Sequence, residues 1–182
     1  DAAYGGYFIL ANNLASETRT SFNSIHKADS VVVDPHKHGL QPYGCGCVLF
    51  KNPEVGAYYK HDSPYTYFSS DDLHLGEISL ECSRAGASAV ALWATQQLMP
   101  LTDGSNFAKA ISLCRNAACD LHSRLDADDR FLTVVAPELD IVLWAPTDGN
   151  ASVISTLSRN MFDNAAARNL HLALVELPEC LL

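Results

Sequence analysis

The stretch "SVVVDPHKHGL", residues 30–40, places a lysine between two histidines directly after a β-branched run. The valines Val31 to Val33 predict a buried β-strand, and Asp34-Pro35 ends it because proline cannot extend the hydrogen bonding of a sheet. Lys37 therefore follows a strand end, and in open α/β sheets the strand ends face the ligand crevice. An amine held there can form an imine with a carbonyl compound, although a solvated loop lysine has the same local pattern.

The composition of the whole chain limits the classes of protein. The chain has 182 residues, 48% of them hydrophobic, and a formal net charge of −9. It contains no basic run longer than a dipeptide, so nucleic acid is not an expected partner. It also lacks an apolar run of the ~20 residues that cross a bilayer and a positively charged leader, so we expect a soluble, cytoplasmic protein without a membrane anchor. Six irregularly spaced cysteines without a CxxC motif indicate reduced thiols.

Working outward from the lysine, the pattern predicts the later part of an α/β domain. Cys45 to Phe50 forms a second short apolar strand, residues 62–75 form a polar and aromatic surface loop, and Ala87 to Met99 is apolar on all sides, which predicts a core helix. Pro100 stops this helix, so residues 100–104 are the best domain boundary.

The remainder predicts a compact α+β unit. Its expected elements are a helix over about Ser105 to Leu125, strands near Phe131 to Val135 and Asp140 to Trp144, a helix from about Ala151 to Ala167, and a strand near His171 to Glu176. Because the chain opens without a capping signal and closes on an apolar "CLL", we expect it to be a segment of a longer polypeptide.

A second motif, "DAAYGG", lies about thirty-five residues before the lysine and adds a carboxylate and small residues at another expected strand end. These residues suit pyridoxal phosphate, which needs an amine for its aldehyde, a carboxylate for its pyridine nitrogen and room for a flat ring. Lys37, Asp1 and Ala3 would fill these three roles.

Four stretches together resemble the group II pyridoxal-phosphate-dependent amino-acid decarboxylases, and most closely their tyrosine and aspartate decarboxylase branch. They are "DAAYGG", "ADSVVVDPHKHG", "PYGCGCVLFK" and "LECSRAGASAVALW". The resemblance implies the aspartate-aminotransferase-like fold, fold type I. Residues 1–101 would belong to the large cofactor-binding domain, and residues 104–182 would form a small C-terminal α+β domain. It also implies a homodimer that converts an L-amino acid to its amine and carbon dioxide.

The resemblance assigns roles to individual residues. Lys37 matches the Schiff-base lysine of the family, and His36 matches the histidine that lies near the cofactor and its phosphate. Asp1 matches the aspartate that pairs with the pyridinium nitrogen, and Ala3 matches the alanine packed on the ring. Arg84 matches an arginine at the substrate side, where it could anchor the carboxylate.

Two features of the family are not fully matched. Its phosphate-binding residues and the ring that stacks on the cofactor lie upstream of the matching aspartate, so this sequence does not contain them. A tyrosine of a loop returns a proton to the substrate carbon in the family. Tyr65 and Tyr67 lie in the corresponding loop, and the spacing does not select one of them.

Two other interpretations stay open. His36, His38, Cys45 and Cys47 form an HxH followed by a CxC, and imidazole with thiolate is a zinc ligand set. The chain could also be a non-catalytic interaction protein that keeps the decarboxylase fold without its activity. The decarboxylase interpretation itself predicts no bound metal.

Overall fold

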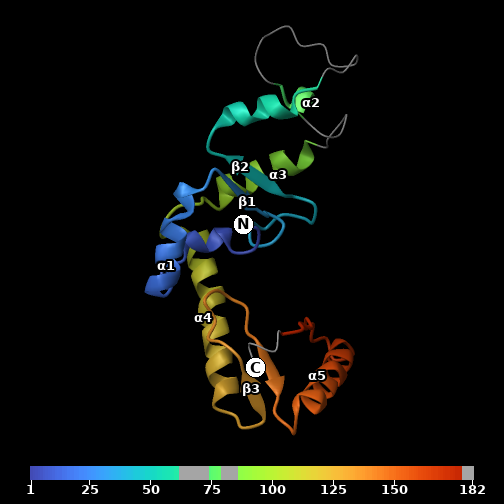
Figure 1. Ribbon diagram of the computed structural model, residues 1–182. Coiled ribbons are helices and arrows are strands. Elements are labelled where there is room, and N and C mark those ends of the chain that lie inside the picture. The colour runs from blue at the N-terminus through green and yellow to red at the C-terminus, as the bar shows by residue number, and fades with distance from the viewer. Residues whose placement is uncertain (62–73, 79–85, 178–182) are drawn as a thin grey trace. The chain divides into compact units, whose positions relative to one another are not determined.

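The structure, a computed structural model, describes residues 1–61, 74–78 and 86–177 (Figure 1). The chain divides into two compact units, residues 1–111 and residues 112–182. The division falls within the long helix α4 (Asn106–Asp126). The predicted domains, 1–101 and 104–182, stay a prediction, and each unit is described here by itself.

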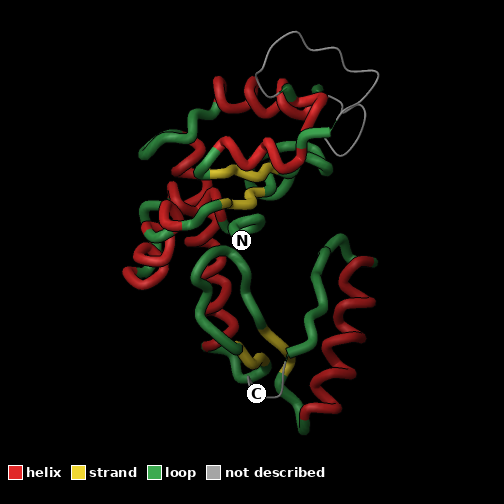
Figure 2. Tube along the Cα trace, turned by 45° about the horizontal axis from the view of Figure 1, so that its top comes forward, coloured by secondary structure: helices red, strands yellow, loops and turns green. Residues whose placement is uncertain are grey.

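The first unit is built around an antiparallel hairpin. Its strands are β1 (Ser30–Val33) and β2 (Cys47–Phe50), and Figure 2 shows them side by side. Ser30 faces Phe50 and Val33 faces Cys47, so residues 34–46 form the connection between the strands. Both predicted strands are confirmed, and the PHKHG motif lies in this connection, directly after β1.

The first residues of the chain run beside the end of β1. The backbone N–H of Ala2 donates to the carbonyl of Val32, and that of Asp34 donates to the carbonyl of Ala3, both at 3.0 Å. Gly6 allows this close approach, because a Cβ there would lie 3.1 Å from a methyl group of Val33. The DAAYGG segment and the start of the lysine loop are therefore neighbours.

The core of the first unit contains residues from η1 (Gly6–Leu10), α4 and the lysine loop. The short helix η1 buries Tyr7 and Phe8, of which Phe8 has no exposed surface. The ring of Tyr7 lies 5.5 Å from that of Phe107 on α4. Pro35 of the lysine loop is also fully buried, so the loop begins on the core.

The described part of the first unit contains five further helices. They are α1 (Ser16–Asn23), η2 (Ile25–Lys27), η3 (Pro53–Tyr59), α2 (Leu75–Ile78) and α3 (Ala87–Leu98). The predicted helix at α3 is confirmed, but its predicted core position is wrong, since Trp93 is 63% and Leu98 83% exposed. Strands β1 and β2 were expected to be buried, but Leu49 on β2 is 57% exposed. An apolar face is buried only by a second packed layer, and the described part of this unit puts none over these faces.

The second unit contains the rest of α4, a hairpin and a helix. Strands β3 (Phe131–Thr133) and β4 (Trp144–Pro146) pair antiparallel, and the rings of Phe131 and Trp144 meet edge to face at 5.4 Å. Helix α5 (Ala151–Ala166) follows, as predicted, and the Asn150 side chain accepts hydrogen bonds from its first N–H groups. The strand predicted near Asp140 to Trp144 shares only Trp144 with β4, which begins at that residue.

The predicted strand at residues 171–176 is wrong. Residues 171–177 form no strand, and Val175 is 61% exposed. Its β-like sequence finds no partner among the described strands, and a strand requires one for its hydrogen bonds.

Across residues 1–61, 74–78 and 86–177, no helix has the length and apolar character needed to cross a membrane.

Candidate active site

Lys37 is held by the carboxylate that ends β1. Its Nζ donates to Asp34 Oδ2 at 2.7 Å, and its backbone N–H donates to the Asp34 carbonyl at 2.9 Å. The lysine side chain remains 36% exposed, while that of Asp34 is 17% exposed. The amine is therefore oriented by its own turn and still reachable from solvent.

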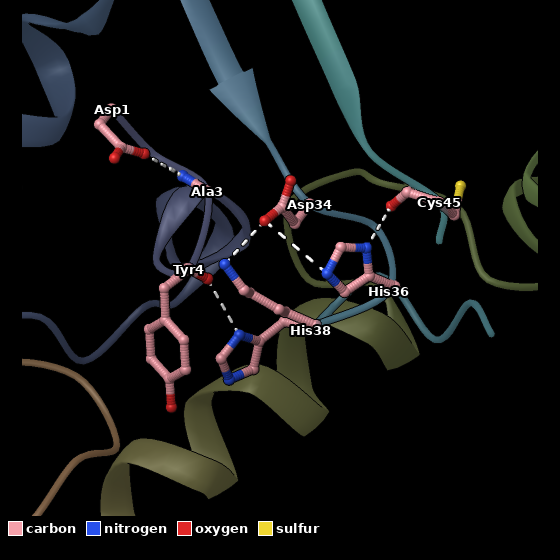
Figure 3. A network of polar contacts seen from close by, with 8 residues as sticks. Asp1, Ala3, Tyr4, Asp34, His36, His38 and Cys45 are labelled. Carbon is pink, nitrogen blue, oxygen red and sulfur yellow. Dashed lines mark hydrogen bonds and ion pairs between the residues drawn. The ribbon is translucent and has the colours of Figure 1, made fainter. Parts of the chain in front are cut away.

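His36 is fixed on the other side of the same carboxylate (Figure 3). Its Nδ1 donates to the Cys45 carbonyl at 2.8 Å, and its backbone N–H donates to the same oxygen at 3.1 Å. Because a carbonyl only accepts, Nδ1 carries the hydrogen, and Nε2 faces Asp34 Oδ2 at 3.8 Å. Asp34 is thus shared by the lysine and the histidine.

The loop that carries Lys37 is closed by Gln41 and Gly39. The Gln41 backbone N–H donates to the Pro35 carbonyl at 3.1 Å, and its buried side-chain amide donates to Thr95 Oγ1 on α3 at 2.8 Å. A Cβ at Gly39 would lie 2.7 Å from the Cα of Pro35 and still closer to the Tyr7 hydroxyl. Only glycine fits there without a shift of the backbone, so the loop is tightly packed.

Asp1 and Ala3 lie on the segment beside this loop. The Asp1 carboxylate accepts the backbone N–H of Ala3 at 2.9 Å, and the Ala3 carbonyl accepts that of Asp34. The structure therefore places Asp1 and Ala3 on the segment that runs next to the loop carrying His36 and Lys37. The other predicted site residues, Tyr65, Tyr67 and Arg84, lie outside the described residues.

These residues fit one part of pyridoxal phosphate. The exposed Lys37 amine suits its aldehyde, and the exposed, backbone-anchored carboxylate of Asp1 suits a protonated ring nitrogen. Ala3 carries only a methyl group, the small side chain that packing against a flat ring requires. The roles of the individual residues stay predictions.

The zinc interpretation is not supported by the geometry. The Nδ1 atoms of His36 and His38 face the carbonyls of Cys45 and Tyr4, not the thiols. Within the described ranges, no group of three or more His, Cys, Asp or Glu side chains could hold a metal ion.

The Cys47 thiol and the Tyr7 phenol near the loop are uncharged at neutral pH. Burial raises the pKa of the Cys47 thiol, and the neighbouring Cys45 thiol raises it further. Burial also raises the pKa of Tyr7, with smaller contributions from the same two thiols. Cys47 and Tyr7 are therefore poor nucleophiles, and Lys37 is the better candidate for covalent chemistry.

A cavity of about 250 Å³ also occurs in the first unit. It is lined by residues 9–12, Arg19, Asp103 and Gly104, none of which is a predicted site residue. The Arg19 guanidinium donates to the backbone carbonyls of Ile9 and Ala11. Its hydrogen bonds thus hold the end of η1.

Asp34, Gln41 and the contacts of His38 were not predicted from the sequence. The spacing of Asp34, three residues before Lys37, was an available signal for an ion pair within one turn. Gln41 and His38 gave no such signal, because their partners Thr95 and Tyr4 are distant in the sequence.

An amine and a carboxylate on adjoining segments are two of the groups that pyridoxal phosphate requires of its site. The chain belongs to the pyridoxal-dependent decarboxylase family, since residues 1–145 match the sequence model of the "Pyridoxal-dependent decarboxylase conserved domain". The family predicted from the four sequence stretches is confirmed.

Curated relatives agree with this placement. The chain is 29% identical to an L-tyrosine decarboxylase of Enterococcus faecium over 91% of its own length and 34% of the relative's. It is 30% identical to a probable L-tyrosine/L-aspartate decarboxylase of Methanothermobacter thermautotrophicus, over 79% of the chain and 37% of the relative. The chain thus spans about a third of the length of these relatives.

Solved structures confirm the fold. Mouse CSAD in its apo form matches with a TM-score of 0.79 at 17% identity, over 97% of this chain and 38% of that one. Oryza sativa TDC with PLP and tryptamine matches with a TM-score of 0.82 at 16% identity, over 97% and 37%. The predicted α/β fold of this enzyme class, the aspartate-aminotransferase-like fold type I, is therefore confirmed. The zinc-domain and non-catalytic interpretations receive no support from these comparisons.

Proposed function

We propose that this chain supplies the lysine-bearing part of a decarboxylase that uses pyridoxal phosphate to convert an L-amino acid to its amine and carbon dioxide. The observation that carries the proposal is the placement of Asp1 and Lys37 on adjoining segments at the end of β1. Membership of the decarboxylase family supports it independently.

In this proposal Lys37 attaches the cofactor through its aldehyde, and Asp34 orients the lysine beforehand. When bound, the cofactor supplies an electron sink for the pair of electrons left on the substrate Cα as carbon dioxide departs. His36, fixed by the Cys45 carbonyl, lies on the same loop and would border the phosphate side. Ala3 would lie under the ring.

Asp1 would hold a proton on the ring nitrogen. Its carboxylate accepts the backbone N–H of Ala3 at 2.9 Å, which orients it on this segment. Loss of one partner of such an ion pair, once it is buried, costs about 3–5 kcal/mol. Asp1 would therefore keep the pyridine nitrogen protonated while the bond between the substrate Cα and its carboxylate breaks.

Tyr65, Tyr67 and Arg84 complete the proposed set of residues. One of the two tyrosines would return a proton to the substrate carbon, and Arg84 would bind the substrate carboxylate. Their assignment rests on the family resemblance alone.

The relatives favour an α-amino acid such as tyrosine or aspartate as the substrate class. We also propose that the working protein is a cytoplasmic homodimer. Its phosphate-binding and ring-stacking residues would come from parts of the polypeptide other than these 182 residues.

Substitution of Lys37 tests this function. In the full-length protein, Lys37→Ala should lower carbon dioxide release from the substrate by several orders of magnitude, because no other amine lies in the same loop. Far-ultraviolet circular dichroism should be unchanged, since the side chain is exposed. Lys51→Ala, in the same unit, is the control and should keep full activity. Equal activity of Lys37→Ala and Lys51→Ala would refute the proposal.

A further inference from the structure

His38 makes contacts that none of the roles above uses. Its Nδ1 donates to the backbone carbonyl of Tyr4 at 3.0 Å, across 34 positions in the sequence. Its ring also meets the ring of Tyr4 edge to face at 4.6 Å (Figure 3). The same ring meets the ring of Phe8 edge to face at 5.0 Å. His38 is half-buried by these contacts.

These contacts join the two segments that carry the candidate cofactor residues. Tyr4 belongs to the DAAYGG segment with Asp1, and His38 directly follows Lys37. The same segments are already joined on the other side of the lysine, where the Asp34 N–H donates to the Ala3 carbonyl. Lys37 thus lies between two cross-links to one segment.

The second cross-link is also attached to the core. Phe8, against which the His38 ring packs, is completely buried. A displacement of His38 would therefore disturb a packed aromatic side chain as well as one hydrogen bond. A turn held at both ends has less freedom than one held only at its strand end.

We propose that His38 is a positioning residue that sets the separation of the Lys37 amine from the Asp1 carboxylate, and thereby the affinity for pyridoxal phosphate. The inference rests on the proposed function for the identity of the ligand. The cross-link itself does not, because it can be observed in the protein without cofactor.

Two substitutions separate the hydrogen bond of His38 from its ring. His38→Phe keeps an aromatic ring against Tyr4 and Phe8 but removes the Nδ1 donor. His38→Asn removes the ring, but its amide nitrogen can take the place of Nδ1 and donate to the Tyr4 carbonyl. A matched control is His26→Phe, because His26 Nδ1 also donates to a backbone carbonyl, that of Asn23 at 2.6 Å, but within one turn.

The first measurement is the dissociation constant of pyridoxal phosphate for the full-length apoprotein. His38→Phe should raise it about tenfold, the change that corresponds to loss of one hydrogen bond of typical net strength. His38→Asn should stay within about threefold of the unsubstituted protein, and His26→Phe should not change it. An unchanged constant in His38→Phe, or an equal loss in His38→Phe and His26→Phe, would overturn the proposal.

The second measurement is hydrogen–deuterium exchange of the full-length apoprotein, which needs no cofactor. His38→Phe should speed exchange in peptides covering residues 2–6 and 36–41 together, whereas His26→Phe should leave both unchanged. Unchanged exchange in both peptides would overturn the cross-link. Faster exchange in a protein that binds no pyridoxal phosphate would refute the proposed function and, with it, the role in cofactor affinity, but not the cross-link.

Discussion

At the scale of single residues, the lysine loop depends on side chains that were not themselves candidates for chemistry. Asp34 holds the Lys37 amine, and Gln41 closes the loop onto the carbonyl of Pro35. Gly39 lets the loop pass the Tyr7 hydroxyl. The reactive residue is therefore positioned by its immediate neighbours, and substitutions beside it should change the stability of the loop.

Gly39→Ala should destabilise the protein. A methyl group there would overlap the Pro35 backbone at 2.7 Å, and backbone cannot rotate away as a side chain can. We expect a loss of about 1–3 kcal/mol in the free energy of unfolding, as for other overpacked sites, measured by urea denaturation. Gly46→Ala is the control, because its Cβ would meet only Asp34 Oδ1 at 3.7 Å. Equal stability of the two variants would contradict the tight packing at Gly39.

The sequence predicted some site residues and missed others for a physical reason. Lys37 and Asp1 could be found because a strand end, a proline and small residues mark their places locally. The contact of His38 with Tyr4 crosses 34 positions, so no local pattern reports it. His36, His38 and the two nearby cysteines suggested a zinc site, because the spacing of residues does not show which ring atom faces which group.

At the scale of elements, the type of structure was easier to predict than its burial. The hairpin, α3, α4 and α5 follow from β-branched runs, apolar periodicity and capping residues. The exposure of Trp93 on α3 and Leu49 on β2 could not be predicted, because an apolar face shows only that a partner layer suits it. For residues 171–176, likewise, a strand-like composition does not supply a neighbouring strand.

The bond between the lysine loop and α3 can be tested by Thr95→Val. Valine keeps the shape of threonine but removes the oxygen that accepts from the Gln41 amide at 2.8 Å. The remaining acceptors of that amide, the carbonyls of Gly39 and Leu40, are longer at 3.3 and 3.2 Å. We therefore expect a loss of about 1 kcal/mol in the free energy of unfolding.

The matched control for this substitution is Thr156→Val on the exposed part of α5. The Thr156 hydroxyl donates to the Ser152 carbonyl at 3.0 Å, within its own helix, and that carbonyl is an exposed backbone group. Its replacement should change the unfolding free energy by less than about 0.5 kcal/mol. If Thr95→Val were no more destabilising than Thr156→Val in urea titrations, the bond to α3 would contribute nothing to stability.

At the scale of the whole molecule, the chain combines a unit that carries the candidate site with a second α+β unit. The family match covers residues 1–145 and so extends past the first unit, which ends at residue 111. The family and fold class could be predicted from four short stretches, all within the first 93 residues. The predicted boundary at residues 100–104 follows from Pro100 and Gly104 and stays a prediction.

The central claim is that Lys37 carries pyridoxal phosphate. The most direct measurement is reduction of the full-length holoprotein with borohydride, followed by proteolysis and mass spectrometry of the labelled peptide. We predict one modified lysine, Lys37, in the peptide that contains "VVVDPHK". A label on Lys27 or Lys51 in place of Lys37, or an unlabelled protein, would contradict the account.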